Sequence, residues 1–181
     1  MNTSRKIILL NGKAGSGKDF IADWLVKNKG YTKLAFSSIL KKMASERYNL
    51  DVDTFNTQEG KKSYISGSLT VRNALISLSK DIKRHDIYFF VKNVKNEIDS
   101  LFKNNTTKVV VSDYRFPEEY YYLLTYYREY IETISITREN HVIKVFDVSE
   151  FSLENMMFHR QILNKDIENC DIYFSELFNG Y

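Results

Sequence analysis

Short apolar runs alternate along the chain with longer segments in which apolar residues recur every three or four positions. Residues 7–10 (IILL) form a continuous apolar run, which is typical of a parallel strand that is buried on both faces. A glycine-rich turn follows, and then Phe20, Ile21, Trp24 and Leu25 recur at helical spacing. The chain is therefore predicted to begin with a buried strand, a turn and an amphipathic helix.

The same pattern predicts further strands at residues 32–36, 108–113, 132–138 and 171–174. Helices are predicted at 39–50, 71–82 and 87–102 and from Pro117 onward, with Ser37 or Ser38, Thr70 and Asp86 as N-caps. Residues 51–69 are polar and irregular. Because strands alternate with helices, we expect an α/β fold with a mostly parallel, five-stranded sheet flanked by helices.

Length and composition limit the classes of protein that need to be considered. The 181 residues fit one domain, 1–181, with 43% hydrophobic and 27% charged residues. The net charge of +3 is too small to indicate a nucleic-acid partner. No apolar run reaches membrane-spanning length, and the first apolar run is too short for a signal peptide. A single cysteine, Cys170, cannot form an internal disulfide. Lys, Asn, Ile and Tyr are plentiful, a bias that indicates an AT-rich genome such as that of a virus. We therefore expect a cytoplasmic protein, in the host cytoplasm if the source is viral.

The glycine-rich turn has the spacing of a phosphate-binding loop, with Gly12, four residues, Gly17 and then Lys18. Its place between a buried strand and a helix is the context that the motif requires. Backbone N–H groups of residues 13–18 would form an anion-binding nest at a helix N-terminus, where the helix dipole also favours phosphate. Lys18 would reach the β- and γ-phosphates of ATP. The predicted ATP-binding residues of the loop are Gly12, Lys13, Ala14, Gly15, Ser16, Gly17, Lys18 and Asp19.

Asp19 stands where this motif normally has a Ser or Thr that contacts Mg²⁺. Magnesium accepts carboxylate oxygen, so Asp19 could bind the ion directly or through a water molecule. Alternatively, its negative charge simply complements the positive end of the helix. The two roles are compatible.

Asp113 and Arg115 follow the predicted strand 108–113, in the sequence VVVSDYRF. Ligands of open α/β sheets bind beyond the carboxyl ends of the strands. Asp113 is therefore predicted as a second carboxylate near magnesium or as a substrate contact, and Arg115 as a phosphate clamp. Without the phosphate loop nearby, Asp113 would be interpreted as the cap of a turn and Arg115 as a solvent-exposed side chain.

Several segments, taken in order from residue 5 to about 140, resemble the deoxynucleoside monophosphate kinases of bacteriophages and their relatives. These segments are GKAGSGKDFIADWL, LAFSSILKKMA, TVRNALISLSKDI, FFVKNV, VVVSDYRFPEE and ISITR. The resemblance implies a three-layer P-loop fold of the nucleoside-monophosphate-kinase type and Mg²⁺-ATP as phosphoryl donor. It implies catalytic roles for Lys18, Arg72, Arg115 and Asp113. It also implies substrate binding by Lys41, Arg72 and Arg115, ATP binding by Arg138, and metal binding by Asp19 and Asp113.

Animal-type phosphomevalonate kinase is a relative with the same Gly-Lys-Asp loop and a matching Asp-x-Arg segment, so the acceptor stays open between two classes. The last forty residues fit the viral family poorly, and its terminal helix is expected to be missing. An ATP-binding protein with decayed activity is therefore a third alternative. The histidines His85, His141 and His159 lack metal-ligand spacing, so capping or solvated roles are expected.

Aromatic residues decide the expected acceptor. A nucleobase requires an aromatic or arginine face, and the chain offers Tyr88, Phe89, Phe90, Tyr114 and Phe116 near the predicted acceptor side. We therefore expect phosphorylation of a deoxynucleoside monophosphate (dNMP) to its diphosphate. The tyrosine-rich segment 120–130 is typical of core or of a subunit contact and could support a homodimer.

Overall fold

The computed structural model describes residues 5–138, 152–153, 156–164 and 170–181. His141 lies outside this range. The strands are β1 (Lys6–Asn11), β2 (Thr32–Leu34), β3 (Tyr64–Ser66), β4 (Leu69–Thr70), β5 (Lys108–Val111), β6 (Ile131–Arg138) and β7 (Arg160–Asn164). The α-helices are α1 (Lys18–Lys29), α2 (Ser37–Tyr48), α3 (Gln58–Lys62), α4 (Val71–His85), α5 (Phe89–Lys103), α6 (Pro117–Tyr127) and α7 (Cys170–Leu177), with a 3₁₀ helix η1 (Val52–Phe55).

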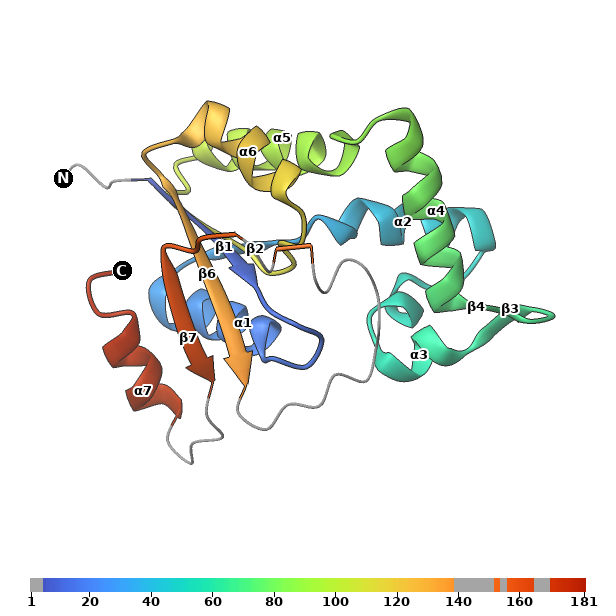
Figure 1. Ribbon diagram of the computed structural model, residues 1–181, viewed down its shortest axis with the longest axis horizontal. Coiled ribbons are helices and arrows are strands. Elements are labelled where there is room, and N and C mark those ends of the chain that lie inside the picture. The colour runs from blue at the N-terminus through green and yellow to red at the C-terminus, as the bar shows by residue number, and fades with distance from the viewer. Residues whose placement is uncertain (1–4, 139–151, 154–155, 165–169) are drawn as a thin grey trace.

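Five strands form one parallel sheet in the order β2-β5-β1-β6-β7, with helices on both faces (Figure 1). Side chains of β1 alternate between the two faces, so Ile7 and Leu9 belong to one core and Ile8 and Leu10 to the other. α5 and α6 cover the first face, whereas α1 and α7 cover the second. The expected three-layer α/β class is confirmed.

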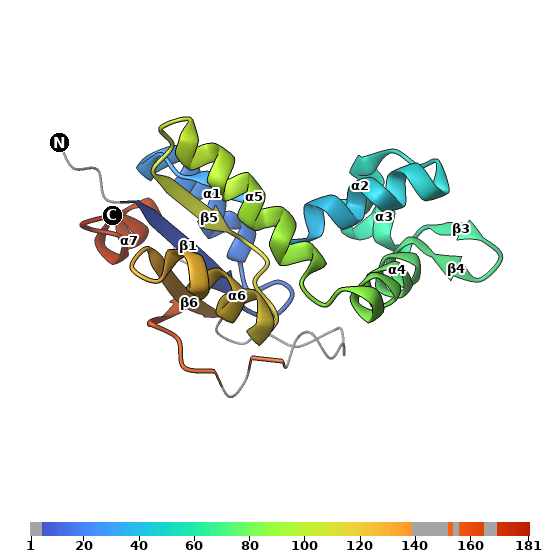
Figure 2. The ribbon, with the colours of Figure 1, turned by 90° about the horizontal axis from the view of Figure 1, so that it is seen from above.

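Residues 37–85, from α2 to α4, form a lobe beside the sheet, which we call the side lobe (Figures 1 and 2). It includes the short hairpin β3–β4. α2 contacts α4 and η1 within the lobe and also contacts α5 of the main body. The segment 51–69, which looked irregular in sequence, thus carries η1, α3 and the hairpin.

The prediction of a strand at residues 171–174 is wrong, because these residues lie in α7. Phe174 and Phe178 are four positions apart, are buried against the sheet, and pack on Trp24 of α1. The fifth strand is instead β7, which pairs with β6. α7 also ends the chain with a helix, where none was expected.

Of the three predicted caps, the one at Thr70 is confirmed and the other two are wrong, while the predicted helix start at Pro117 is confirmed. Thr70 accepts the Asn73 N–H at the start of α4, and Pro117 is the first residue of α6. α2 starts at Ser37 without a serine cap, and α5 starts at Phe89, after the predicted position. Asp86 instead follows α4 and accepts the Tyr88 N–H at 2.9 Å.

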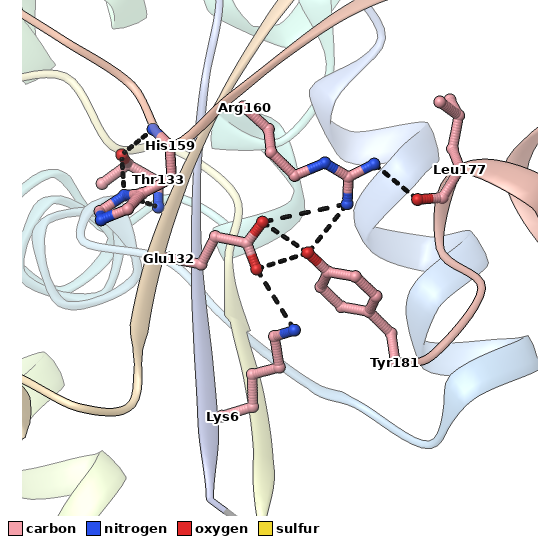
Figure 3. Close-up of polar contacts among 7 residues, drawn as sticks. All are labelled: Lys6, Glu132, Thr133, His159, Arg160, Leu177 and Tyr181. Carbon is pink, nitrogen blue, oxygen red and sulfur yellow. Dashed lines mark hydrogen bonds and ion pairs between the residues drawn. The ribbon is translucent and has the colours of Figure 1, made fainter.

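A polar network fastens the C-terminal elements at the amino end of the sheet (Figure 3). The Tyr181 hydroxyl donates to the Glu132 carboxylate at 2.5 and 2.6 Å, and Arg160 donates to Tyr181 and to the Leu177 carbonyl. Lys6 forms an ion pair with Glu132 at 3.3 Å. The network therefore ties β1, β6, β7 and the end of the chain together.

His159 has a structural role in the same region. The ring Nδ1 of His159 accepts the backbone N–H of Thr133 at 3.0 Å, and the backbone N–H of His159 donates to the Thr133 hydroxyl (Figure 3). The ring thereby joins the chain just before β7 to β6. Within the described ranges, no group of three or more His, Cys, Asp or Glu residues could hold a metal ion.

Candidate active site

The phosphate loop leads from the carboxyl end of β1 into α1, as predicted. Gly15 and Gly17 have φ values of 86° and 93°, which side chains rarely adopt. A Cβ on Gly12 would lie 2.4 Å from the Ile136 carbonyl oxygen of β6, so the loop passes directly over the neighbouring strand. The two positive φ values and this close approach explain why the sequence has glycine at these three positions.

The Lys18 ammonium lies within the loop. It donates to the carbonyl oxygens of Gly12 and Lys13, and the residue is only 7% exposed. A buried ammonium that contacts the backbone of the same turn, at the N-terminus of a 12-residue helix, provides the positive site that a polyphosphate requires. The loop residues present therefore fit the phosphates of ATP.

Asp19 is on the exposed side of the first turn of α1. Its Oδ1 lies 3.1 Å from the Lys33 ammonium, which also contacts Asp23 at 3.0 Å. Partial burial acts to raise the pKa of Asp19, but the hydrogen bonds and charge of Lys33 outweigh this effect and lower it, with smaller help from Ser112 and Lys18. Asp19 is thus an ionised, accessible carboxylate beside the loop, which suits a metal ligand.

Asp113 lies at the carboxyl end of β5, and its carboxylate faces α2. One oxygen accepts the Phe36 N–H at 2.7 Å and the other accepts the Ser37 N–H at 2.9 Å. These donors are at the start of α2, where backbone N–H groups lack helical partners. Asp113 therefore serves as the N-cap that neither Ser37 nor Ser38 provides. Its predicted metal role stays a prediction.

Arg115 is positioned by a buried carboxylate. Glu119 Oε2 accepts the backbone N–H groups of Arg115 and Phe116, at 2.9 and 3.1 Å. Burial raises the pKa of Glu119 to about 8, and the nearby charge of Asp113 adds to this, while the two backbone hydrogen bonds oppose it. The turn that carries Arg115 is thus fastened to the first turn of α6.

Four half-buried cations come from separate elements, and three of them, Lys41 of α2, Arg72 of α4 and Arg115 after β5, lie close enough to the fourth, Lys61 of α3, to affect it. We call them the cation cluster. Burial lowers the pKa of Lys61, and the charges of the other three members lower it further. The negative charge of Asp19 raises the pKa of Lys61, so the cluster also lies within electrostatic range of the loop that Asp19 adjoins. Such effects reach on the order of 10 Å at physiological salt.

Two amide side chains hold members of the cation cluster. The Lys41 ammonium donates to Asn56 Oδ1 at 3.0 Å, and Arg72 Nη2 donates to Gln58 Oε1 at 3.0 Å. Sequence reasoning missed Lys61, Asn56 and Gln58, because the segment 51–69 has no motif. Its only signal was a concentration of polar residues between two elements that carry predicted phosphate-binding residues.

Arg138 ends β6 and is exposed. Its register partner on β7 is Asn164, whose side-chain amide donates to the Ser16 carbonyl at 2.9 Å. β6 and β7 therefore bring Arg138 and Asn164 to the edge of the sheet from which the loop emerges. Asn164 is a further residue that sequence reasoning missed.

The aromatic residues expected around the acceptor are divided between core and surface. Tyr114 and Phe90 are buried in the core, with exposed fractions of 0% and 5%, and the Phe89 ring packs edge-on against Phe90. Phe116 is half-buried, and the Lys83 ammonium lies 3.3 Å from its ring centroid. Tyr88 is exposed and stacks against Tyr122. Most of these rings are therefore not available to a base.

Among solved structures, the likeness to a dephospho-CoA kinase supports the fold. Dephospho-CoA kinase from Campylobacter jejuni aligns with a TM-score of 0.52 and 13% identity, covering 96% of this chain and 98% of that one. Shikimate kinase from Aquifex aeolicus vf5 aligns with a TM-score of 0.39 and 12% identity, covering 96% and 98%. No curated protein matches the chain. None of the helices in the described ranges could span a membrane.

A model of the phosphomevalonate kinase family matches residues 10–129, from the end of β1 beyond the end of α6. The matched segment contains the phosphate loop, the side lobe and the turn with Arg115. It ends before β6, so Arg138 and the C-terminal elements lie outside it. The chain is a P-loop kinase, and it belongs to the phosphomevalonate kinase family.

Proposed function

We propose that the protein transfers the γ-phosphoryl group of ATP to the phosphate of a small phosphomonoester. The observation that carries this proposal is the arrangement of the cation cluster, which comes from the side lobe and the β5–α6 turn and lies within electrostatic range of Asp19 beside the loop. Phosphoryl transfer requires positioning and charge neutralisation more than covalent chemistry from the protein. A site with a phosphate loop on one side and several cations on the other meets both requirements.

On the donor side, residues 12–17, Lys18 and Arg138 would hold the phosphates of ATP. Mg²⁺-ATP supplies the phosphoryl group and neutralises part of its charge. Asp19 is the best-placed carboxylate for the metal, because its exposed side chain is kept ionised beside the loop. Asp113 was the second predicted carboxylate, and its contacts with α2 favour a positioning role instead.

On the acceptor side, Lys41, Arg72 and Arg115 would hold the acceptor phosphate. Each guanidinium can present two N–H donors to two phosphate oxygens, which fixes orientation as well as charge. No general base is needed, because a phosphate acceptor is already anionic near neutral pH. Glu119 also accepts the backbone N–H of Arg115, which holds in place the backbone from which the Arg115 side chain extends.

We infer that the acceptor carries a carboxylate in addition to its phosphate, as phosphomevalonate does. Lys61 supports this inference, because it adds a fourth positive charge to the three assigned to the phosphate. The family match points to the same substrate. A dNMP is the second candidate, supported by the half-buried ring of Phe116 next to Arg115. The buried positions of Phe90 and Tyr114 weaken the case for a base.

The deciding experiment is a coupled ADP-release assay with Mg²⁺-ATP and a panel of phosphomevalonate and the four common dNMPs, with products identified by mass spectrometry. We expect diphosphomevalonate to form. Lys61→Ala should raise the KM for phosphomevalonate about tenfold or more, the range of a lost charged contact. Lys62→Ala is a matched control on the same short helix, with an exposed side chain. Phosphorylation of nucleotides alone would favour the second candidate, and absence of transfer to any member would overturn the proposal.

A further inference from the structure

The end of β7 holds the phosphate loop from a part of the chain outside the family match. Asn164 Nδ2 donates to the Ser16 carbonyl oxygen at 2.9 Å across 148 positions of sequence. The same amide nitrogen lies against Gly17, where an added Cβ would come within 2.2 Å of it. The amide is therefore bonded to one loop residue and packed on the next.

The position of Asn164 is itself fixed by neighbouring elements. Ile162 is 2% exposed and lies in the core between the sheet and the helices α1 and α7. The Tyr173 hydroxyl of α7 donates to the Leu163 carbonyl at 2.9 Å, and Asn164 pairs in register with Arg138. β7 thus presents the amide from a supported strand rather than from a free surface.

The hydrogen bond constrains the direction of a loop N–H. The Ser16 carbonyl and the Gly17 N–H belong to one planar peptide unit, and the described chain has only trans peptides. In a trans peptide these two groups point in opposite directions. With the carbonyl fixed toward Asn164, the Gly17 N–H points away from β7. The bond to the carbonyl also polarises the peptide and strengthens its N–H as a donor.

We propose that Asn164 is a positioning residue of the nucleotide site, which orients the Gly17 N–H for the phosphates of ATP. Gly17 needs such support because glycine has wide conformational freedom and this one is held at φ 93°. The proposal rests on the proposed ATP-binding role of the loop. It assigns a function to β7 and α7, which carry none of the other residues placed in the site.

The test is ADP binding by isothermal titration calorimetry, without acceptor, followed by separate KM values for ATP and for acceptor. Asn164→Ala removes the donor, and Asn164→Asp keeps the shape while replacing the donor with an acceptor. Asn28→Ala is the matched control, because Asn28 donates the same kind of bond to the Trp24 carbonyl on α1. Circular dichroism and thermal melting establish that each variant is folded.

We expect both Asn164 variants to bind ADP about five- to thirtyfold more weakly, the loss of one well-formed hydrogen bond. The KM for ATP should rise while the KM for acceptor stays unchanged, and Asn28→Ala should bind ADP as the wild type does. Normal ADP affinity in a folded Asn164→Asp variant would overturn this inference. Failure of the wild type to bind ADP would instead overturn the proposed function, so the two failures can be told apart.

Discussion

Replacement of Asp113 separates a metal-binding role from a helix-capping role. Its two oxygens accept the N–H groups of Phe36 and Ser37, 77 and 76 positions away in sequence. Lys41 lies one turn further along α2 and belongs to the cation cluster. Loss of the carboxylate should therefore loosen the start of α2 and, through it, the placement of Lys41.

The size of the effect follows from the two contacts. Hydrogen bonds to a charged group contribute about 1.5–3 kcal/mol each. Asp113→Asn keeps one acceptor oxygen and places an NH₂ group against the other N–H, so it should lower the free energy of unfolding by about 1.5–3 kcal/mol. Asp113→Ala removes both acceptors and should lower it by about 3–6 kcal/mol, twice the loss of one such bond. For a chain of this length, the Asn variant should melt roughly 3–10 °C lower.

Urea unfolding gives the stability change, and steady-state kinetics as a function of Mg²⁺ gives the functional one. Capping predicts a higher KM for acceptor in Asp113→Asn, with an unchanged Mg²⁺ concentration for half-maximal rate. Asp51→Asn is the control, because Asp51 caps η1 by accepting the Asp53 N–H without bridging separate elements. A wild-type melting temperature together with a clearly raised Mg²⁺ requirement would refute the capping argument and support the metal role.

Three further predictions concern single charges in the site. Lys18→Ala should lower turnover at least ~10²-fold while the fold survives, with the exposed Lys27→Ala as control; near-normal turnover would remove the phosphate-loop assignment. Asp19→Asn should raise the Mg²⁺ concentration needed for half-maximal rate, whereas a role limited to the helix dipole would change only stability, by about 0.3–1 kcal/mol. Glu119 has its pKa raised to about 8 in the folded chain, so between about pH 4.5 and 8 the folded state holds a proton that the unfolded state has lost. Stability should therefore fall as pH rises through this window. Glu119→Gln should flatten that dependence in urea titrations at pH 5 and 8, and an equal fall in the variant would contradict the assignment.

The parts of the site that depend on local sequence could be predicted. The run 7–10, the two glycines and Lys18 define a strand, a turn and a helix within twenty residues, and each step has a steric or electrostatic reason. The position of Arg115 also follows, because a polar residue after a buried parallel strand must emerge at the carboxyl edge of the sheet. These predictions required no knowledge of distant contacts.

The C-terminal elements could not be assigned from such local signals. Residues 172–174 form a short apolar run that suits either a strand or one turn of a buried helix. The choice depends on Phe178, which completes a helical stripe with Phe174 against Trp24. β7 (RQILN) has one buried apolar side chain, Ile162, and only one other apolar residue, the exposed Leu163, so it lacks an apolar run of strand length.

The roles of individual polar residues were the least predictable, because they depend on partners far away in sequence. Asp113 was placed correctly at the edge of the sheet, but its partners Phe36 and Ser37 lie on another element. Lys61 lies in a segment without a motif and joins the cluster only because α3 packs against α4 and η1. The cation cluster proposed to bind the acceptor is therefore formed by packing of the side lobe, which no local sequence pattern reveals.

The hydrogen-bond partners of the cation cluster explain how a group of like charges can be held in place and still attract an anionic substrate. Burial lowers the pKa of Lys61, and the positive charges of Lys41, Arg72 and Arg115 lower it further. Carboxylate partners would relieve this repulsion but would also cancel the positive potential that attracts phosphate. Lys41 and Arg72 are held instead by the neutral amide oxygens of Asn56 and Gln58. Neutral anchors fix the geometry and leave the charge for an anionic acceptor, so replacing either amide with a carboxylate should weaken acceptor binding even if the hydrogen bond is kept.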